Sequence, residues 1–270
     1  MKIPFQPGSG KPECISRVQK EAITRMQHVV ETRSLGVLTG EVGSGKTTLL
    51  RALTASLPAT DYQVVYLSSA GLPPRELYGG ILRALGETPV FSLGKLKHQW
   101  QEVLNARLLN TARQLLLLID EAHDLPEKTL LELRFLMCRG MDPEAPFPII
   151  LAGQAKLRLD LRKSIYESIA QRIRMQYHLQ GMTAEECAAY IEQQMREAEL
   201  TRPVFSASAI QLIHASSHGI PRVINLLCAH ALFASSQRKD NAIEEKHVMM
   251  VLADLERQRG GDASWSANTA

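Results

Sequence analysis

The chain has 270 residues, of which 45% are hydrophobic and 22% are charged. This composition is typical of a globular protein and excludes a disordered or fibrous one, and the length suits one large α/β domain or such a domain with a small second one. The formal net charge of +3 is too small to identify a nucleic-acid partner. The apolar runs fall far short of the roughly 20 residues that span a bilayer, and the N-terminus lacks the apolar core of a signal peptide. The four cysteines form no C-x-x-C pair, so we expect a cytoplasmic protein with neither disulfides nor a zinc site.

Short apolar runs alternate with helical patterns along the first two thirds of the chain. A Pro- and Gly-rich arm (1–15) precedes a docking helix (16–32). The expected strands are 35–39, 62–67, 115–119, 148–152 and 175–179, and the expected helices are 46–57, 74–85, 93–112 and one starting near Pro126. Because these strands are continuously apolar, the pattern predicts a parallel five-stranded sheet covered by helices on both faces.

The pattern changes after Gly181, where amphipathic helices follow one another without strands. They are expected at 183–200, 206–217, 221–236 and 244–257. Thr183 with Glu186, and Ser206, have the positions of helix N-caps. The predicted organisation is therefore an arm and docking helix (1–33), an α/β nucleotide-binding core (34–181), an all-helical lid (182–257) and a disordered tail (258–270).

The first chemical motif lies between the first expected strand and the helix that follows it. It matches G-x-x-x-x-G-K-[ST], and its glycines allow backbone N–H groups to curl around a phosphate chain at the positive end of a helix. Lys46 can reach the β- and γ-phosphates, and the Thr47 hydroxyl can coordinate Mg²⁺. The alternative, a Gly-rich turn that matches by chance, lacks this strand–loop–helix context. The expected nucleotide-binding residues here are Gly40, Glu41, Val42, Gly43, Ser44, Gly45, Lys46, Thr47 and Thr48.

The second motif is a run of buried residues that ends in Asp120 and Glu121. The carboxyl end of such a strand is where an open α/β sheet binds its ligands. Asp120 is expected to hold the metal beside Thr47, and Glu121 to orient and deprotonate the attacking water. An Asp that merely caps a strand is the alternative, but the phosphate loop 74 positions earlier argues against it.

The two motifs and the helical lid resemble the AAA+ ATPases. Within them, the chain is most similar to the branch with the ExeA-type ATPases and the TnsC, TniB and MuB transposition ATPases. The likeness runs from about residue 14 to 257 and is carried by LTGEVGSGKTT, LIDEAH, ILAGQ, AQRI and GIPRVIN. It implies ATP and Mg²⁺ as cofactors and a P-loop fold with a three-layer α/β/α core and a lid.

The resemblance also implies roles for five further positions. Gln154 resembles the polar sensor between Glu121 and the γ-phosphate, although Asn or Thr is usual there and a plain loop glutamine remains an alternative. Ser68 and Ser69 stand where a polar residue restrains the catalytic Glu. Arg172 resembles an arginine finger that reaches a neighbouring subunit's nucleotide, with Arg174 as the second candidate.

Arg222 resembles the lid arginine that reads the γ-phosphate. A surface arginine at the start of a helix is the alternative.

Basic residues gather at 91–113 and 155–174. Solvated helix faces would account for them, but in a ring or filament the basic loop at Lys95 and Lys97 would repeat in each subunit. It would then bind the DNA backbone without reading bases.

Three functions follow from the resemblance. The favoured one is an ATP-dependent, sequence-nonspecific DNA-binding ATPase that assembles on double-stranded DNA as a ring or helical filament and activates a DDE-type transposase. The alternatives are an ExeA-type secretion or pilus-assembly ATPase and a nucleotide-gated adaptor that does not hydrolyse ATP. ExeA-type proteins generally continue into a membrane helix and a wall-binding domain, which this sequence lacks, so we expect no membrane partner.

Overall fold

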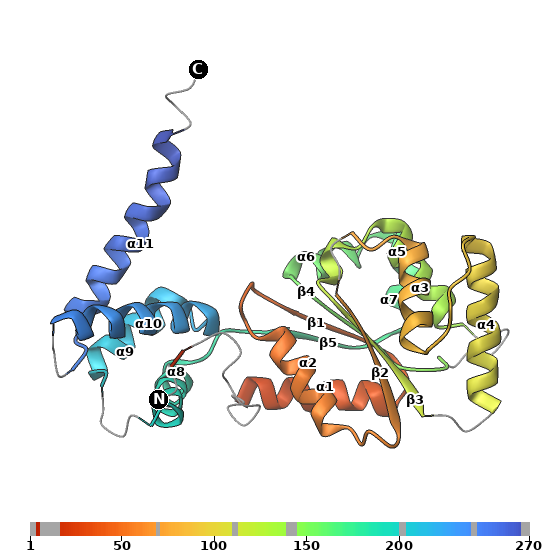
Figure 1. Cartoon of the computed structure of the whole chain (residues 1–270), viewed down its shortest axis with the longest axis horizontal. Coiled ribbons are helices and arrows are strands. Elements are labelled where there is room, and N and C mark those ends of the chain that lie inside the picture. The colour runs from red at the N-terminus through yellow and green to blue at the C-terminus, as the bar shows by residue number, and fades with distance from the viewer. Residues whose placement is uncertain are drawn as a thin grey trace. The chain divides into compact units, whose positions relative to one another are not determined.

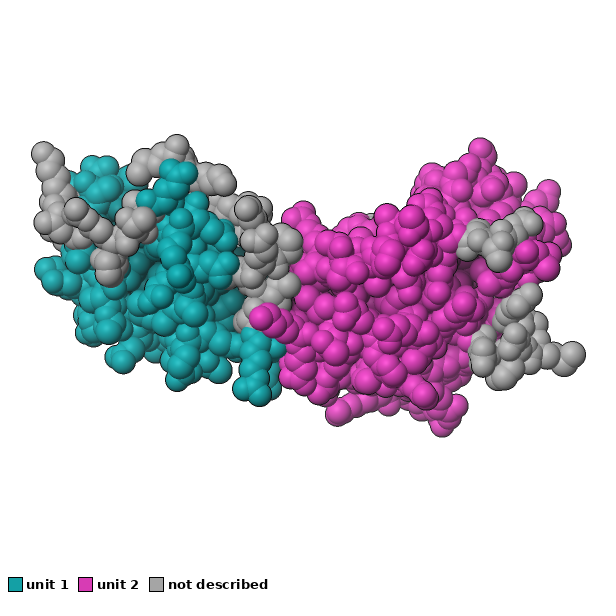
Figure 2. All heavy atoms as spheres, turned by 90° about the horizontal axis from the view of Figure 1, so that it is seen from below, with its two compact units in different colours: residues 1–18, 43–45, 180–270 teal, residues 19–42, 46–179 magenta. Residues whose placement is uncertain are grey.

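The computed structural model describes residues 4–5, 17–68, 71–109, 113–138, 145–199, 204–238 and 242–265. These residues fold as two compact units, coloured separately in Figure 2. The core unit comprises the described residues within 19–42 and 46–179, and the helical unit those within 1–18, 43–45 and 180–270.

The core unit is built on one parallel sheet of five strands with the order β2-β3-β4-β1-β5. The strands are β1 Leu35–Gly40, β2 Tyr62–Ser68, β3 Gln114–Asp120, β4 Ile149–Gly153 and β5 Ile173–Leu179. The predicted parallel sheet is confirmed. Since all carboxyl ends of parallel strands meet at one edge, the loops after β1, β3 and β4 are neighbours although they are far apart in sequence.

Burial distinguishes the three central strands from the two edge strands. Every residue of β1 and β4 is buried, and so is all of β3 except Gln114. The edge strands contain exposed positions, such as Tyr66 in β2 and Arg174 in β5. This explains why the central strands are continuously apolar in sequence, because both of their faces are covered.

Helices cover both faces of this sheet (Figure 1). On one face lie α1 Arg17–Glu31 and α2 Lys46–Ser56; Gly36 of β1 leaves no room for a Cβ beside Val29 of α1. On the other face lie α3 Pro74–Ala84, α4 Leu93–Leu109, α5 Glu127–Leu136, α6 Ala155–Asp160 and α7 Glu167–Ala170. The sequence did not indicate α6, α7 or the 3₁₀ turns η1 Ala122–Asp124 and η2 Ser164–Tyr166, which are too short to show a helical period.

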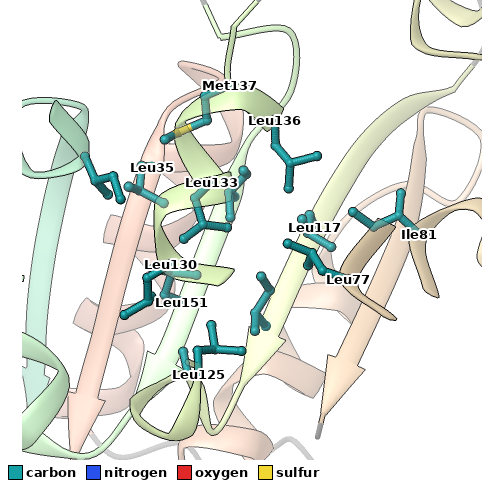
Figure 3. Close-up of a cluster of buried hydrophobic side chains, with 14 of the residues drawn as sticks. Leu35, Leu77, Ile81, Leu117, Leu125, Leu130, Leu133, Leu136, Met137 and Leu151 are labelled. Atoms are coloured by element: carbon teal, nitrogen blue, oxygen red, sulfur yellow. The ribbon is translucent and has the colours of Figure 1, made fainter. Parts of the chain in front are cut away.

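The larger apolar core lies between the sheet and the helices α3 to α7. Figure 3 shows how side chains of α3 and α5 pack onto three strands of the sheet. Leu35, Leu117 and Leu151 point from β1, β3 and β4 toward these helices, and all three are 0% exposed. Apolar side chains at every second strand position thus anchor the strands whose ends form the candidate site.

The helical unit has its own apolar core, made of residues such as Ile191, Ile213 and Ile224. Its helices are α8 Ala184–Glu197, α9 Ala207–Ser217, α10 Pro221–Arg238 and α11 Glu245–Trp265. The predicted caps are confirmed: Thr183 forms a capping box with Glu186, and the Ser206 hydroxyl accepts from the Ala209 amide at 3.2 Å.

At the two ends of the chain, one expectation needs revision and the other is described only in part. The disordered tail predicted for 258–270 is wrong up to Trp265, because α11 continues to that residue, and 266–270 lie outside the described residues. Of the N-terminal arm, only residues 4–5 are described. There Phe5 is 4% exposed and packs edge-on against Phe205, with ring centroids 6.2 Å apart. Within the described part of the chain, no helix is both long enough and apolar enough to cross a membrane.

Candidate nucleotide-binding site

The loop between β1 and α2 has the backbone conformation that a phosphate-binding loop requires. Gly43 and Gly45 adopt φ values of +83° and +96°, which other residues rarely reach. Lys46, the first residue of α2, is 6% exposed, and its Nζ donates to the carbonyl oxygens of Gly40 and Glu41 at 3.0 Å each. The ammonium group is therefore held against the loop at the positive end of a helix.

Ser44 supports the assignment of this loop to an anionic ligand. Its hydroxyl is buried and has no hydrogen-bond partner among the described residues. A buried hydroxyl without a partner is costly, and a phosphate oxygen would satisfy it. Together with the two positive-φ glycines, Ser44 shows that the residues of the loop fit a nucleotide phosphate.

Asp120 at the end of β3 joins two of the motifs predicted from sequence. It is 2% exposed, and its Oδ2 accepts a 2.7 Å hydrogen bond from the Thr47 hydroxyl. Its Oδ1 accepts from the Glu121 amide at 2.9 Å. A hydroxyl and a carboxylate oxygen in contact are the hard donors that Mg²⁺ prefers, so this pair could hold the ion.

Glu121 differs from Asp120 in both exposure and backbone. Its side chain is 47% exposed, and its φ of +53° places it in the left-handed region that glutamate seldom occupies. Such strained residues persist at functional sites when the surrounding structure imposes them. The Glu121 carboxylate therefore faces solvent at the edge of the sheet, next to the buried carboxylate of Asp120. A proton acceptor needs this exposure because it must reach the attacking water.

Tyr66 is a site residue that sequence reasoning missed. Its hydroxyl donates to Asp120 Oδ2 at 2.9 Å, so this oxygen has two donors, Tyr66 and Thr47. Partial desolvation of the phenol, together with the hydrogen bond to Asp120, raises the pKa of Tyr66, so the hydroxyl remains a donor although much of the side chain is exposed. The available signal was its place in the strand that pairs with β3, where Ser68 stands opposite Asp120.

Ser68 and Ser69 are the polar residues expected to restrain Glu121. The Ser68 hydroxyl interacts with Tyr66, and Ser69 lies outside the described residues.

Gln154 directly follows β4, and β4 lies between β3 and β1, so the sheet order places the expected sensor between Asp120 and the phosphate loop. Its backbone amide donates to His123 Nδ1 at 3.4 Å. His123 is the second residue that the sequence analysis left without a role, although it stands in the same Asp-Glu-Ala-His run as Glu121.

Arg222 lies in the first turn of α10, as expected. Its backbone amide donates to the Gly43 carbonyl at 3.3 Å, and both residues belong to the helical unit. A Cβ on Gly43 would collide with the Arg222 side chain.

Arg172 and Arg174 are both exposed, so exposure does not distinguish the two candidates for the finger. The Arg172 guanidinium donates to the Ser168 carbonyl at 2.8 Å and to Cys138 Sγ at 3.4 Å. Arg174 lies within β5 and no such contact is recorded for it in the described part of the chain. Of the two, Arg172 is the one whose guanidinium is held in a defined position.

The segment expected to bind DNA differs from the expectation. Lys95 and Lys97 lie not on a loop but in the first turns of α4. Lys97 Nζ pairs with Glu132 Oε1 at 2.6 Å and lies 5.0 Å from the centroid of the Phe135 ring. Lys97 is thus engaged within the core unit, whereas Lys95 is exposed.

The second basic segment forms a cavity of about 280 Å³ on the surface of the core unit. Arg158, Arg162 and Lys163 line it together with one acidic residue, Glu167. Lys163 is paired with Asp160 at 2.6 Å. Among the described residues, the guanidinium groups of Arg158 and Arg162 have no hydrogen-bond or ion-pair partner, which leaves both groups available to an external anion.

The fold and this site define a P-loop nucleotide-binding protein. The chain belongs to the AAA domain family, because the model of that family matches residues 27–161, half of the chain. A curated relative, general secretion pathway protein A of Aeromonas hydrophila, is 31% identical over 233 residues. That alignment covers 86% of this chain and 42% of the relative, so the chain spans about two fifths of its length.

Solved structures show the same fold at low identity. The ORC2 protein of Aeropyrum pernix in its ADP form has a TM-score of 0.65 and 16% identity, over 92% of this chain and 71% of that one. Cdc6p of Pyrobaculum aerophilum has a TM-score of 0.66 and 17% identity, over 88% and 67%. The Thermotoga maritima RuvB branch migration motor has a TM-score of 0.56 and 19% identity, over 93% and 73%. These matches establish the AAA+ fold.

Proposed function

We propose that this chain is an ATP-hydrolysing AAA+ module of the ExeA type that serves a secretion or assembly machine. The observation that carries the hydrolysis is the contact between Thr47 and Asp120 beside the exposed Glu121. The secretion assignment is supported by the 31% identity to general secretion pathway protein A. The comparison thus favours the secretion function over the transposition function that the sequence alone suggested.

The residues of the chain would divide the work as follows. The loop amides and Lys46 bind the phosphate chain, and Ser44 supplies one more donor. Thr47 and Asp120 hold Mg²⁺, which neutralises charge on the phosphate oxygens when it is bound. Glu121 accepts a proton from the attacking water, and Gln154 acts as the polar sensor between Glu121 and the γ-phosphate.

Glu121 separates a hydrolase from an adaptor that only binds nucleotide. Replacing Glu121 with Gln keeps the shape of the side chain but removes its ability to accept a proton. We expect Glu121→Gln to bind ATP with an affinity within about 3-fold of wild type and to lower the hydrolysis rate by a factor on the order of 10²–10⁴. Glu127→Gln, which changes an exposed carboxylate at the start of α5, is the matched control.

The experiment combines calorimetric titration of ATP with a phosphate-release assay. Wild-type and Glu127→Gln proteins should hydrolyse ATP at similar rates while Glu121→Gln binds without turnover. Equal turnover in all three would remove Glu121 from the mechanism. Binding without turnover in the wild type would favour the adaptor.

We also propose that Arg172 completes the site of a neighbouring copy of the chain. An arginine supplied by a neighbour accelerates related phosphoryl transfers by roughly 10³–10⁵. The test is to mix Arg172→Ala, which retains its phosphate loop, with Lys46→Ala, which retains its arginine. If both variants are inactive alone, partial activity of the mixture supports Arg172. A mixture that co-assembles and stays inactive would redirect the assignment to Arg174.

DNA binding is the second candidate function, and the cavity at Arg158 and Arg162 favours it. Two guanidinium groups without a counter-ion on the described chain suit the phosphates of double-stranded DNA. In this case ATP would assemble the chain on DNA, where it would engage a DDE-type transposase. ATP-dependent, salt-sensitive fluorescence anisotropy with unrelated duplexes would support this function, whereas absence of binding at low salt would leave the secretion function alone.

A further inference from the structure

His123 occupies a position that neither the proposed roles nor the family comparisons explain. It lies in the 3₁₀ turn η1, two residues after Glu121, and its side chain is only 7% exposed. The turn packs against the end of β4. A Cβ added to Gly153 would stand 3.1 Å from the backbone nitrogen of His123 and 3.4 Å from its Nδ1. The imidazole is therefore enclosed between the loop that bears Glu121 and the loop that bears Gln154.

One ring nitrogen faces both of these loops. His123 Nδ1 accepts a hydrogen bond from the Gln154 backbone amide at 3.4 Å, and it lies 3.4 Å from Glu121 Oε2. The other nitrogen, Nε2, lies 3.6 Å from Asp124 Oδ1. The ring thus connects the expected proton acceptor to the expected sensor through a single atom.

The chemistry of imidazole makes these two contacts exclusive. In a given tautomer, Nδ1 either carries a lone pair and accepts a hydrogen bond or carries a proton and donates one. When Nδ1 carries the lone pair, it can accept a hydrogen bond from the Gln154 amide but cannot donate one to a carboxylate. When Nδ1 carries the proton, it can donate a hydrogen bond to Glu121 but can no longer accept one from the Gln154 amide.

We propose that His123 is a positioning residue that couples the Gln154 loop to the orientation of the Glu121 carboxylate. While Nδ1 accepts from Gln154, the ring does not bind Glu121, and the carboxylate is free to take a proton from water. When the Gln154 loop moves away, Nδ1 can carry the proton and hold Glu121 against the ring. This coupling rests on the proposed ATP hydrolysis and gives the site a way to use Glu121 only when the Gln154 loop is in place.

Three variants separate this role from a purely structural one. His123→Leu fills the space without any polar atom, His123→Asn can present an amide oxygen near the position of Nδ1, and His98→Leu changes an exposed histidine of α4 as a control. We expect His123→Leu to lower kcat about 10- to 100-fold while KM changes less than about 3-fold. His123→Asn should recover at least part of the loss, and His98→Leu should match wild type.

A double variant tests whether the effect passes through Glu121. If it does, His123→Leu should cost nothing more in the Glu121→Gln background, because the group that it positions is already lost. A further 10-fold loss in that background would overturn the coupling. So would a wild-type kcat in the folded His123→Leu protein.

A readout that needs no turnover keeps the inference separate from the proposed function. In the nucleotide-free protein, ¹⁵N NMR should find His123 Nδ1 unprotonated in the neutral ring, and the Gln154 amide should be protected from hydrogen exchange. That protection should fall in His123→Leu and persist in His123→Asn. If the wild type does not hydrolyse ATP, the proposed function fails while these measurements still test the contact. An Nδ1–H tautomer, or unchanged protection in His123→Leu, would overturn it.

Discussion

The sequence indicated two functional regions: the loops at the carboxyl ends of β1 and β3, expected to bind nucleotide, and the start of helix α4, expected to bind DNA. The structure brings the predicted residues of the first region together, whereas in the second region it pairs a predicted residue within the core unit. At this edge of the sheet, Thr47 of α2 and Asp120 of β3 come from positions far apart in the chain, and the Thr47 hydroxyl donates to Asp120 Oδ2 at 2.7 Å. In α4, Lys97 is engaged by Glu132 and by aromatic rings of the same unit. A motif with fixed spacing between a strand and a helix specifies backbone geometry, whereas a basic residue specifies only a long side chain that can reach several partners.

The largest expected effect tests the strand-end side of this comparison. Lys46→Ala removes the cation held by the carbonyls of Gly40 and Glu41. Because charge-assisted hydrogen bonds to the phosphates are lost, ATP affinity should fall by about 100-fold on calorimetric titration. Lys95→Ala, an exposed lysine, should leave the affinity unchanged. Equal affinities of wild type and Lys46→Ala would show that the loop does not bind the phosphates.

The next largest effect is expected on the stability of the protein, and it tests the role of Lys97 in α4. Glu132 is 13% exposed and accepts hydrogen bonds from both Lys97 and Tyr78. Lys97→Ala leaves this carboxylate mostly buried without its cation, so the free energy of unfolding should fall by about 2 kcal/mol in urea titration. The same variant should bind duplex DNA like wild type. A selective loss of DNA binding with unchanged stability would reverse our interpretation of Lys97.

Arg158 and Arg162 of the cavity provide a contrast to Lys97, which is paired within the core unit. The side chains of Arg158 and Arg162 have no hydrogen-bond or ion-pair partner among the described residues, so Arg158→Gln with Arg162→Gln should change the free energy of unfolding by less than about 0.5 kcal/mol. If the chain binds DNA, this double variant should weaken binding and lower the salt dependence by about two phosphate contacts. Unchanged binding would assign the DNA surface elsewhere.

The smallest effect concerns a second motif defined by spacing. Thr183 and Glu186 satisfy each other's backbone amides at the start of α8. Thr183→Ala should lower the free energy of unfolding by about 1 kcal/mol, and Thr183→Ser should retain most of it. Chemical denaturation followed by circular dichroism measures both, and equal stabilities of Ala and Ser variants would contradict the cap.

Much of the fold was predictable because long, periodic elements carry their own signal. The five strands, the long helices and both predicted caps follow the sequence closely. The short helices α6 and α7 were missed because fewer than two turns show no period. The tail was wrongly expected to be disordered up to Trp265, since its Gly and Ser content outweighed the continuation of α11.

The sequence by itself determined the phosphate loop, the carboxylates after β3 and the change from α/β to all-helical structure, because each depends on residue types at fixed spacing along the chain. Only the tertiary structure decided that β4 lies between β3 and β1, which places Gln154 between the two motifs. It also decided that Tyr66 donates to Asp120 and that His123 stands between Glu121 and Gln154. These contacts depend on the order of the strands within the sheet. The residue pattern of one strand shows that it is buried but does not show which other strand it pairs with, so the sequence carries no signal for that order.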